Sequence, residues 1–186
     1  IDSDIQIKNF GIVCDGDNTE KFILEAKNIL EAKGIIFKYF SYPENKGQAY
    51  AVNLALKNIT GEFFICFDCD DIMSVDSISE KVSFLKNNPE YSFCSSQVDI
   101  VNKDWEKIPF ISQEHYFKNK NLFWDILSLN CQPFHCLCRT EKFFNTTKNK
   151  EISIKKAGQN LQILLPVAYN GNFGYIDKIL SKYIQH

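Results

Sequence analysis

Apolar and polar positions alternate with two different periods over the first hundred residues. Short apolar runs predict four strands, at 5–14, 35–41, 62–67 and 91–101. Between them, apolar residues three to four positions apart predict three helices, at about 20–33, 52–60 and 78–86. Alternating strands and helices are typical of an α/β protein with a largely parallel sheet covered by helices, and right-handed crossovers are expected.

The second half of the chain is less regular. Residues 102–120 have no clear period and are interpreted as a long surface excursion, followed by a short helix near 122–127. A further helix begins at about Ala157, and Pro166 is expected to kink or shift it. Two final strands are predicted, at 173–176 and 179–184. We expect a single domain over 1–186, with a regular half at 1–101 and an irregular half at 102–186.

Three carboxylates follow directly on the apolar strand at 62–67: Asp68, Asp70 and Asp71. Ligands of open α/β sheets bind just beyond the carboxyl ends of such strands, and the strand at 5–14 also ends at an acid, Asp15. If both strands belong to one parallel sheet, these two ends face the same edge.

Side chains alternate along a strand, so Asp68 and Asp70 leave it on the same side. Two such charges about 4 Å apart repel by roughly 4 kcal/mol at an effective dielectric of 20. A divalent cation that bridges to a phosphate would offset this repulsion. The alternative is an acidic turn that caps the next helix, for which Ser74 and Asp76 look like a start.

Composition narrows the functional class. The chain has 186 residues, 45% hydrophobic and 24% charged, with a net charge of −2 and a pI near 6.0. No basic tract is present, which argues against nucleic acid as a partner. No apolar run reaches the roughly 18 residues of a membrane-spanning helix. The opening Ile1-Asp2-Ser3-Asp4 shows neither a signal peptide nor a starting Met, so we expect a fragment of a cytoplasmic protein.

Seven cysteines are scattered along the chain. They are expected to be reduced thiols that pack as small hydrophobes. A zinc site is the alternative, and Cys136-Leu137-Cys138 with His135 is the candidate for it.

Four landmarks appear in an order that resembles one family. Residues 13–17 resemble a V-D-D-G-S turn, and residues 44–53 resemble an E-N-x-G-x-x-x-A-x-N loop and helix. Residues 61–71 resemble G-E-Y-I-x-F-L-D-x-D-D, which includes a D-x-D motif, and residues 183–186 resemble a terminal Y-R-x-H. Together they resemble the bacterial family-2 glycosyltransferases, which have the nucleotide-sugar-binding GT-A fold.

The resemblance implies a role for each matching position. Asp15 would hold the base of the donor, Lys46 and Asn53 would lie near the nucleotide, and Asp68 would contact the ribose. The resemblance also implies a cofactor, Mn²⁺ or Mg²⁺, bound by Asp70. His186 would complete the metal or phosphate site; the alternative is that it is a frayed terminal residue.

The chain departs from the family pattern in three places. Cys14 replaces the first Asp of the D-D-G-S turn. The family's opening strand, which ends in P-x-Y-N, has no room before Phe10, so the chain resembles an N-terminally truncated member whose nucleotide pocket depends on that strand. Gln159 and Asn160 stand where the family usually has a Glu-Asp pair with the general base, in a pattern that resembles a Gly-Gln-Asn-x-Gln subgroup.

Amides cannot accept a proton as carboxylates do. The general base is therefore unassigned, and Gln159 and Asn160 are candidates for hydrogen bonds to the acceptor or the donor sugar. Four possible stand-ins for the base remain, each with a surface role as the alternative: Asp125, Glu141, Glu151 and His135.

The leading functional hypothesis is a metal-dependent, inverting glycosyltransferase of bacterial surface-polysaccharide synthesis. Its partners would be a UDP-sugar donor and a glycan or lipid-linked acceptor, with peripheral association at the inner face of the membrane. A non-catalytic nucleotide-sugar-binding module is the second hypothesis. A phosphohydrolase with an Asp nucleophile is the third, although Ile72 and Met73 stand where such enzymes carry Thr or Val, and their motif normally follows the first strand.

Overall fold

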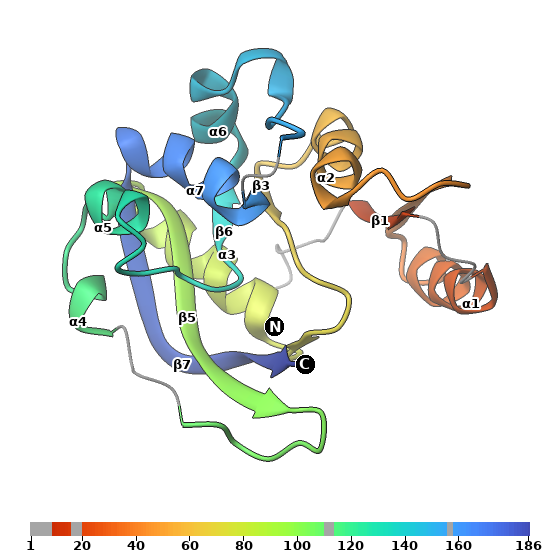
Figure 1. The fold of residues 1–186 in the computed structure, drawn as a ribbon, viewed down its shortest axis with the longest axis horizontal. Helices are drawn as coiled ribbons and strands as arrows, with labels where there is room; N and C mark the ends of the chain where they lie inside the picture. Colours follow the sequence, from red (N-terminus) through yellow and green to blue (C-terminus); the bar gives the residue numbers. More distant parts are fainter. Residues whose placement is uncertain (1–8, 16–19, 110–113, 156–157) are drawn as a thin grey trace.

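The computed structural model describes residues 9–15, 20–109, 114–155 and 158–186 (Figure 1). Three parts of the sequence predictions lie outside the described residues. They are the first residues of the strand predicted at 5–14, the turn that follows Asp15, and residue Ala157.

The predicted alternation of strands and helices is confirmed over the described part of the first hundred residues. Its elements are β1 (Asn9–Asp15), α1 (Glu20–Glu31), β2 (Ile36–Tyr42), α2 (Gln48–Lys57), β3 (Phe63–Ile65), β4 (Ile72–Met73), α3 (Ser77–Asn87) and β5 (Tyr91–Asn102). Strand β3 is shorter than the predicted 62–67, and β4 was not predicted. Helix α3 does begin after Ser74 and Asp76, with Asp76 at its N-cap.

The second half contributes short helices and two strands. They are α4 (Glu114–Phe117), α5 (Phe123–Leu127), β6 (Leu137–Arg139), α6 (Thr140–Thr146), the 3₁₀ helix η1 (Lys148–Lys150), α7 (Gln159–Tyr169) and β7 (Asn172–Gln185). Helix α7 continues through Pro166. Among the described residues, no helix combines the length and the apolar character needed to cross a membrane.

The prediction of two final strands is wrong, because β7 is one long strand. Ile176 pairs with Ser96 of β5 and Ile179 pairs with the next residue, Gln97. Asp177 and Lys178 therefore form an irregularity within the strand, which lets polar residues interrupt the apolar pattern without ending the pairing.

The described strands form a parallel pair, β1–β2, and a five-stranded sheet of order β3-β6-β5-β7-β4. In the larger sheet only β5 and β7 are parallel, and its other pairs are antiparallel. The expectation of a largely parallel sheet is thus wrong for this sheet, although the chain is α/β as predicted. Strands β6 and β7 from 102–186 lie between strands from 1–101, so the two predicted halves share one sheet.

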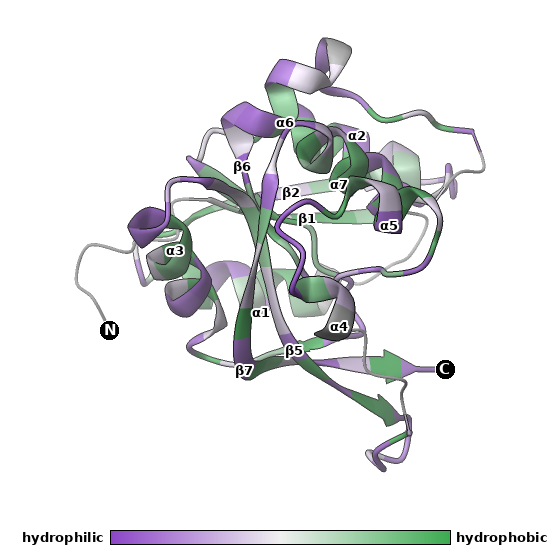
Figure 2. Ribbon diagram, turned by 90° about the vertical axis from the view of Figure 1, so that its left-hand side faces the viewer, coloured by the Kyte–Doolittle hydropathy of each residue, from purple (hydrophilic) through white to green (hydrophobic). Residues whose placement is uncertain are grey.

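Helices cover both faces of the five-stranded sheet (Figure 2). Phe93 and Cys94 are adjacent on β5 and fully buried, yet they belong to different apolar clusters. The cluster that contains Phe93 packs against α2, α5, α6 and α7, and the cluster that contains Cys94 packs against α3. This two-sided cover fixes the ends of β3, β4 and β7, where the candidate site lies.

Candidate functional site

The three predicted carboxylates lie in a tight turn between β3 and β4, and the fold gives each a different environment. The Asp71 N–H donates to the Asp68 carbonyl over 3.2 Å, which closes the turn. The Asp71 side chain is only 1% exposed, whereas the Asp70 side chain is 48% exposed. The Asp71 carboxylate therefore lies in the interior, and the carboxylate of its neighbour Asp70 faces solvent.

Asp70 contacts the last residue of the chain. His186 Nε2 lies 3.0 Å from Asp70 Oδ2, although 116 positions separate the two residues. Strand β7 carries His186 to this point, and Figure 1 shows its arrowhead ending beside the yellow loop that holds the carboxylates. His186 thus has a defined partner and does not match the alternative of a frayed terminal residue.

The donor atoms of this pair suit the predicted cation. Carboxylate oxygen and imidazole nitrogen are both established ligands of divalent first-row metals, and carboxylate also suits Mg²⁺. Across the described ranges, no three His, Cys, Asp or Glu side chains are grouped to hold a metal ion alone. An ion at Asp70 and His186 would therefore take its remaining ligands from a bound phosphate or from water.

Asp68 is held by a residue to which the sequence analysis assigned no role. Gln48 Nε2 donates to Asp68 Oδ1 over 3.0 Å from the first turn of α2. Burial raises the pKa of Asp68, and the like charges of Asp71 and Asp70 raise it further. Gly47, at φ +90°, allows the chain to turn into α2 in a conformation that L side chains rarely adopt, and this turn places Gln48 against Asp68.

Lys46 lies in the same loop, among aromatic rings. Its Nζ is 5.0 Å from the ring centre of Tyr50 and 5.4 Å from that of Tyr42. Such cation–π contacts restrain a long side chain while its ammonium group keeps its charge. Lys46 precedes Gly47 and Gln48, and Gln48 contacts Asp68. Its role near the nucleotide stays a prediction.

Asn53 has a different place from the one predicted. Its side chain is buried, its Nδ2 donates to the Ile152 carbonyl over 2.8 Å, and its Oδ1 accepts the Ile152 N–H over 2.7 Å. The Asn53 side-chain amide thus both donates to and accepts from the backbone of Ile152, in the second half of the chain. This geometry gives Asn53 a structural role and does not place it at the nucleotide.

Asp15 is the last residue of β1, where it pairs with Tyr42; its side chain lies outside the described atoms. The preceding residue, Cys14, is close enough to act on Cys69 in the carboxylate turn. The pKa of Cys69 is raised, first by burial and then by Asp70, with a smaller contribution from Cys14. The end of β1 therefore lies near the turn after β3, but not at the edge of one parallel sheet as considered from the sequence, because β1 and β3 belong to different sheets.

Gln159 and Asn160 occupy the first turn of α7 and are partly exposed. The segment before this turn is held by Gln162, whose Oε1 accepts the Ser153 N–H over 2.6 Å and whose Nε2 donates to the Ser153 carbonyl over 3.1 Å. These two hydrogen bonds fix Ser153, before α7, against the first turn of that helix. They therefore help to fix the positions of Gln159 and Asn160 in that turn.

The four possible stand-ins for a general base have diverse surroundings. Glu151 is ion-paired with Lys57, and Asp125 belongs to α5. Both ring nitrogens of His135 are engaged, with Asp71 and Ser181, so neither can take a proton from an acceptor without breaking this network. The same bonds keep His135 from ligating a metal with Cys136 and Cys138.

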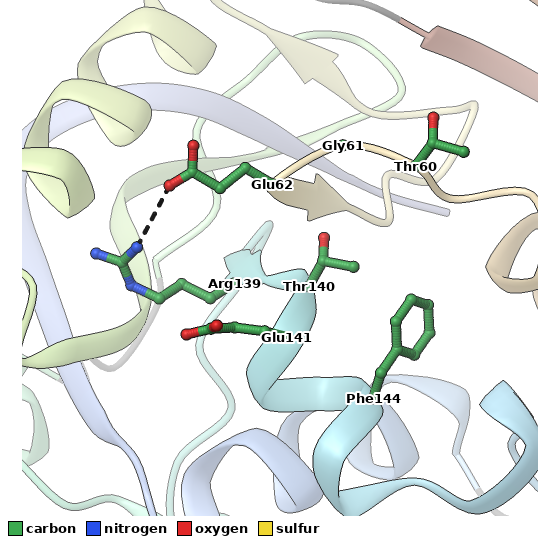
Figure 3. Close-up of a pocket in the computed structure, with 7 residues that line it drawn as sticks. All are labelled: Thr60, Gly61, Glu62, Arg139, Thr140, Glu141 and Phe144. Carbon is green, nitrogen blue, oxygen red and sulfur yellow. Dashed lines mark ion pairs between the residues drawn. The ribbon is translucent and has the colours of Figure 1, made fainter.

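Glu141, the fourth, lines a pocket of about 390 Å³. Figure 3 shows the pocket's lining residues: Thr60, Gly61, Glu62, Arg139, Thr140, Glu141 and Phe144. Residues 60–62 precede β3, whereas the carboxylate turn follows it. The pocket therefore opens at the other end of β3, and we assign it no part in the carboxylate site.

Four of the cysteines pack as small apolar side chains, as predicted: Cys94, Cys131, Cys136 and Cys138. Burial raises the pKa of Cys136 to about 12 and that of Cys131 to about 11. Thiols with such values carry little thiolate at neutral pH and are poor nucleophiles.

A comparison with known families identifies the chain. Residues 10–184 match the profile of glycosyl transferase family 2. The chain belongs to this family. The match covers β1 through β7 and includes every site residue discussed above except His186. It also argues against the phosphohydrolase alternative.

Individual relatives of this chain are longer proteins. An uncharacterized glycosyltransferase of Rickettsia felis is 28% identical over 94% of this chain, which spans 28% of that protein. The UDP-Glc:alpha-D-GlcNAc-diphosphoundecaprenol beta-1,3-glucosyltransferase WfgD of Escherichia coli is 30% identical over 60% of this chain and 42% of its own length.

Two solved structures share the fold. Staphylococcus aureus TarS in complex with UDP-GlcNAc superposes with a TM-score of 0.72 and 16% identity, over 98% of this chain and 52% of that one. The mannosyltransferase PcManGT from Pyrobaculum calidifontis, in complex with GDP-Man and Mn²⁺, superposes with a TM-score of 0.62 and 11% identity, over 93% of this chain and 46% of that one. These likenesses confirm the predicted GT-A-like fold.

Proposed function

We propose that this protein transfers a sugar from a UDP-sugar to a glycan or lipid-linked acceptor, with inversion. The observation that carries the proposal is the exposed Asp70–His186 pair, 3.0 Å apart, beside the partly buried Asp68. A nucleoside diphosphate needs a cation for its phosphates and a hydrogen-bond acceptor for its ribose hydroxyls, and this turn offers groups for both. When bound there, Mn²⁺ or Mg²⁺ neutralises the negative charge that develops on the departing diphosphate.

The residues of the chain have distinct tasks in this proposal. Asp70 and His186 hold the ion, and Asp68 accepts hydrogen bonds from the ribose. Gln48, which donates to Asp68, orients that carboxylate. Asp15, at the end of β1, holds the base, and Lys46 lies near the nucleotide.

The substrates of a relative and the ligand of a structural neighbour support the choice of substrates. The Escherichia coli relative uses UDP-Glc and an alpha-D-GlcNAc-diphosphoundecaprenol acceptor, and TarS is bound to UDP-GlcNAc. We infer from them a UDP-sugar donor and a role in bacterial surface-polysaccharide synthesis. A nucleotide sugar carries charges that oppose its passage through a bilayer. The proposal therefore places transfer in the cytoplasm, at the inner face of the membrane when the acceptor is lipid-linked.

A thermal-shift titration with UDP, GDP, CDP and dTDP, each with and without Mn²⁺, tests donor and metal together. A ligand that binds only the folded state adds about 2.7 kcal/mol of stability at a hundredfold excess over its Kd. We expect a Mn²⁺-dependent shift with UDP that Asp70→Asn abolishes. Glu90→Gln is the matched control and should keep the thermal shift. Glu90 is an exposed acid directly before the first residue of β5. A wild-type protein that shows no shift with any of the four contradicts the proposal.

A non-catalytic nucleotide-sugar-binding module is the second candidate, and Gln159 and Asn160 at the start of α7 favour it. Release of UDP from a panel of UDP-sugars distinguishes the two functions. Turnover by the wild-type protein supports the transferase. Binding of UDP with Mn²⁺ but no turnover, even after Asn160→Asp introduces a carboxylate, supports the binding module.

A further inference from the structure

A chain of three buried side chains lies directly beneath the exposed pair. His135 Nε2 is 2.7 Å from Asp71 Oδ2, and His135 Nδ1 is 2.7 Å from Ser181 Oγ. The side chains of Asp71 and His135 are 1% and 6% exposed. Asp71 follows Asp70 in the carboxylate turn, and Ser181 belongs to β7, so the imidazole joins the two segments that carry the exposed pair.

The donors and acceptors of this network can be assigned from its chemistry. An ionised carboxylate only accepts, so Nε2–H of His135 donates to Asp71, and Nδ1 then accepts from the Ser181 hydroxyl. The other oxygen of Asp71, Oδ1, accepts the Ile184 N–H over 2.9 Å. Both oxygens of Asp71 are thus occupied within the fold, which separates this acid from the solvent-facing Asp70.

The imidazole is held in place from several sides. His135 has a left-handed backbone, with φ +47°, and its carbonyl accepts a 2.8 Å hydrogen bond from the buried Lys81. The ring centre of Phe67 lies 4.5 Å from that of the imidazole, and the Ser95 hydroxyl donates to the carbonyl of Phe134. Strained backbone of this kind persists only where its surroundings over-determine it, and it clusters at functional sites.

The network reaches His186 through β7. Strand β4, which follows the carboxylate turn, pairs with β7 through Ile72 with Lys182 and Met73 with Ser181. Four residues lie between Ser181 and His186, and the N–H of one of them, Ile184, donates to Asp71. Besides the Asp70–His186 contact itself, the turn and the end of β7 are therefore joined by the β4–β7 pairing, by the Asp71–Ile184 hydrogen bond and by the Asp71–His135–Ser181 chain.

We propose that Asp71, His135 and Ser181 are positioning residues that hold the end of β7 against the carboxylate turn, so that Asp70 and His186 present their donor atoms as a preformed pair to a divalent cation. The proposal rests on the metal site of the proposed function. It gives His135 a task other than the general base or zinc ligand considered from the sequence. Residues that orient metal ligands typically change metal affinity 10- to 100-fold when they are replaced.

The first test measures Mn²⁺ affinity in the presence of UDP, from the electron paramagnetic resonance signal of free Mn²⁺. His135→Phe keeps a ring but loses both hydrogen bonds, and we expect about tenfold weaker binding. His135→Gln can still donate toward Asp71 and should recover part of the affinity. Val167→Ala, in the core on α7 and outside the network, controls for general destabilisation and should leave the affinity unchanged.

A double-mutant cycle separates positioning from a purely structural role. If His135 acts through His186, His135→Phe should have little further effect in a His186→Ala background. A loss that stays tenfold in that background overturns the proposal.

Hydrogen exchange at the Ile184 amide supplies a readout that needs no metal. Because this N–H is bound by Asp71, His135→Phe should speed its exchange relative to the β7 amides that pair with β5, and Val167→Ala should not do so selectively. Unchanged Ile184 exchange together with unchanged Mn²⁺ affinity overturns the positioning role. If the wild-type protein binds no Mn²⁺ with any of the four diphosphates, the proposed function fails, and the Ile184 exchange alone then supports or overturns the inference.

Discussion

Two regions of this protein follow the same sequence rules and reach different degrees of burial. In the first, which comprises β1, α1 and β2, large apolar side chains stay exposed: Phe10 at 41%, Phe22 at 70%, Leu24 at 60%, Ile29 at 51% and Ile36 at 58%. In the second, the five-stranded sheet and its helices, comparable side chains are buried: Leu56, Phe93 and Phe143 at 0% and Phe173 at 2%.

The difference teaches that periodicity identifies which side chains can pack but not what covers them. The predicted apolar stripe of α1 contained Phe22 and Ile29, and both are largely exposed. A two-stranded sheet with one helix offers few surfaces for packing, whereas a five-stranded sheet has helices on both faces.

The largest expected effect comes from emptying the core of the second region. Phe143 is fully buried, and its ring centre lies 5.5 Å from that of Phe64 and 5.6 Å from that of Phe144. Phe143→Ala should lower the free energy of unfolding by about 3–5 kcal/mol, because it removes apolar contacts and leaves a cavity. Urea unfolding followed by circular dichroism measures the loss. A change below 1 kcal/mol would show that this core is not packed as described.

A matched pair of glycines sharpens the comparison. A Cβ on Gly171 would lie 2.2 Å from the Val167 carbonyl oxygen and 2.5 Å from Ser92 Oγ, whereas on Gly11 of β1 the nearest atom is 4.0 Å away. Gly171→Ala should therefore destabilise the protein by about 1–3 kcal/mol, and Gly11→Ala should be neutral or stabilising by up to about 1 kcal/mol. The same unfolding measurement decides. Equal effects of the two substitutions would remove the contrast between the regions.

A buried charge sharpens the comparison from within the second region. Lys81 is fully buried, and burial lowers its pKa, because desolvation disfavours the ammonium form. Between this lowered value and 10.5 the unfolded state binds more protons than the folded state, so the stability contributed at this site rises with pH. Lys81→Met removes this pH-dependent contribution. The stability of the Lys81→Met variant relative to wild type should therefore fall as the pH rises from the lowered pKa of Lys81 to 10.5. Urea unfolding of both proteins from pH 7 to 10.5 tests this, and a difference independent of pH would contradict it.

The smallest effect is expected on α1. Phe22 is 70% exposed, so Phe22→Ser should change the free energy of unfolding by no more than about 0.5 kcal/mol. Chemical denaturation of the isolated protein provides the measurement. A loss comparable to that of Phe143→Ala would show that the ring is covered in solution, and the contrast between the two regions would then disappear.

Much of the fold could be predicted from the sequence because its signals are local. Strand β5 and helix α3 follow from apolar spacing within about a dozen residues. Gly47 indicates a turn before α2 by its residue type, and the structure gives it a φ of +90°. The sheet order was not accessible in this way. Strands β6 and β7 insert between strands from the first half, and no local period records which distant strand becomes a neighbour.

The candidate site likewise combines features that the local sequence determines with features that depend on long-range contacts. The sequence by itself determined that carboxylates follow an apolar strand, that a His ends the chain, and that amides stand at the start of α7. Only the tertiary structure decided that Asp70 faces solvent while Asp71 is buried, and that His186 meets Asp70 across 116 positions. A side chain's chemistry is written in its residue type, but its burial and its partners are set by contacts between segments that are remote along the chain.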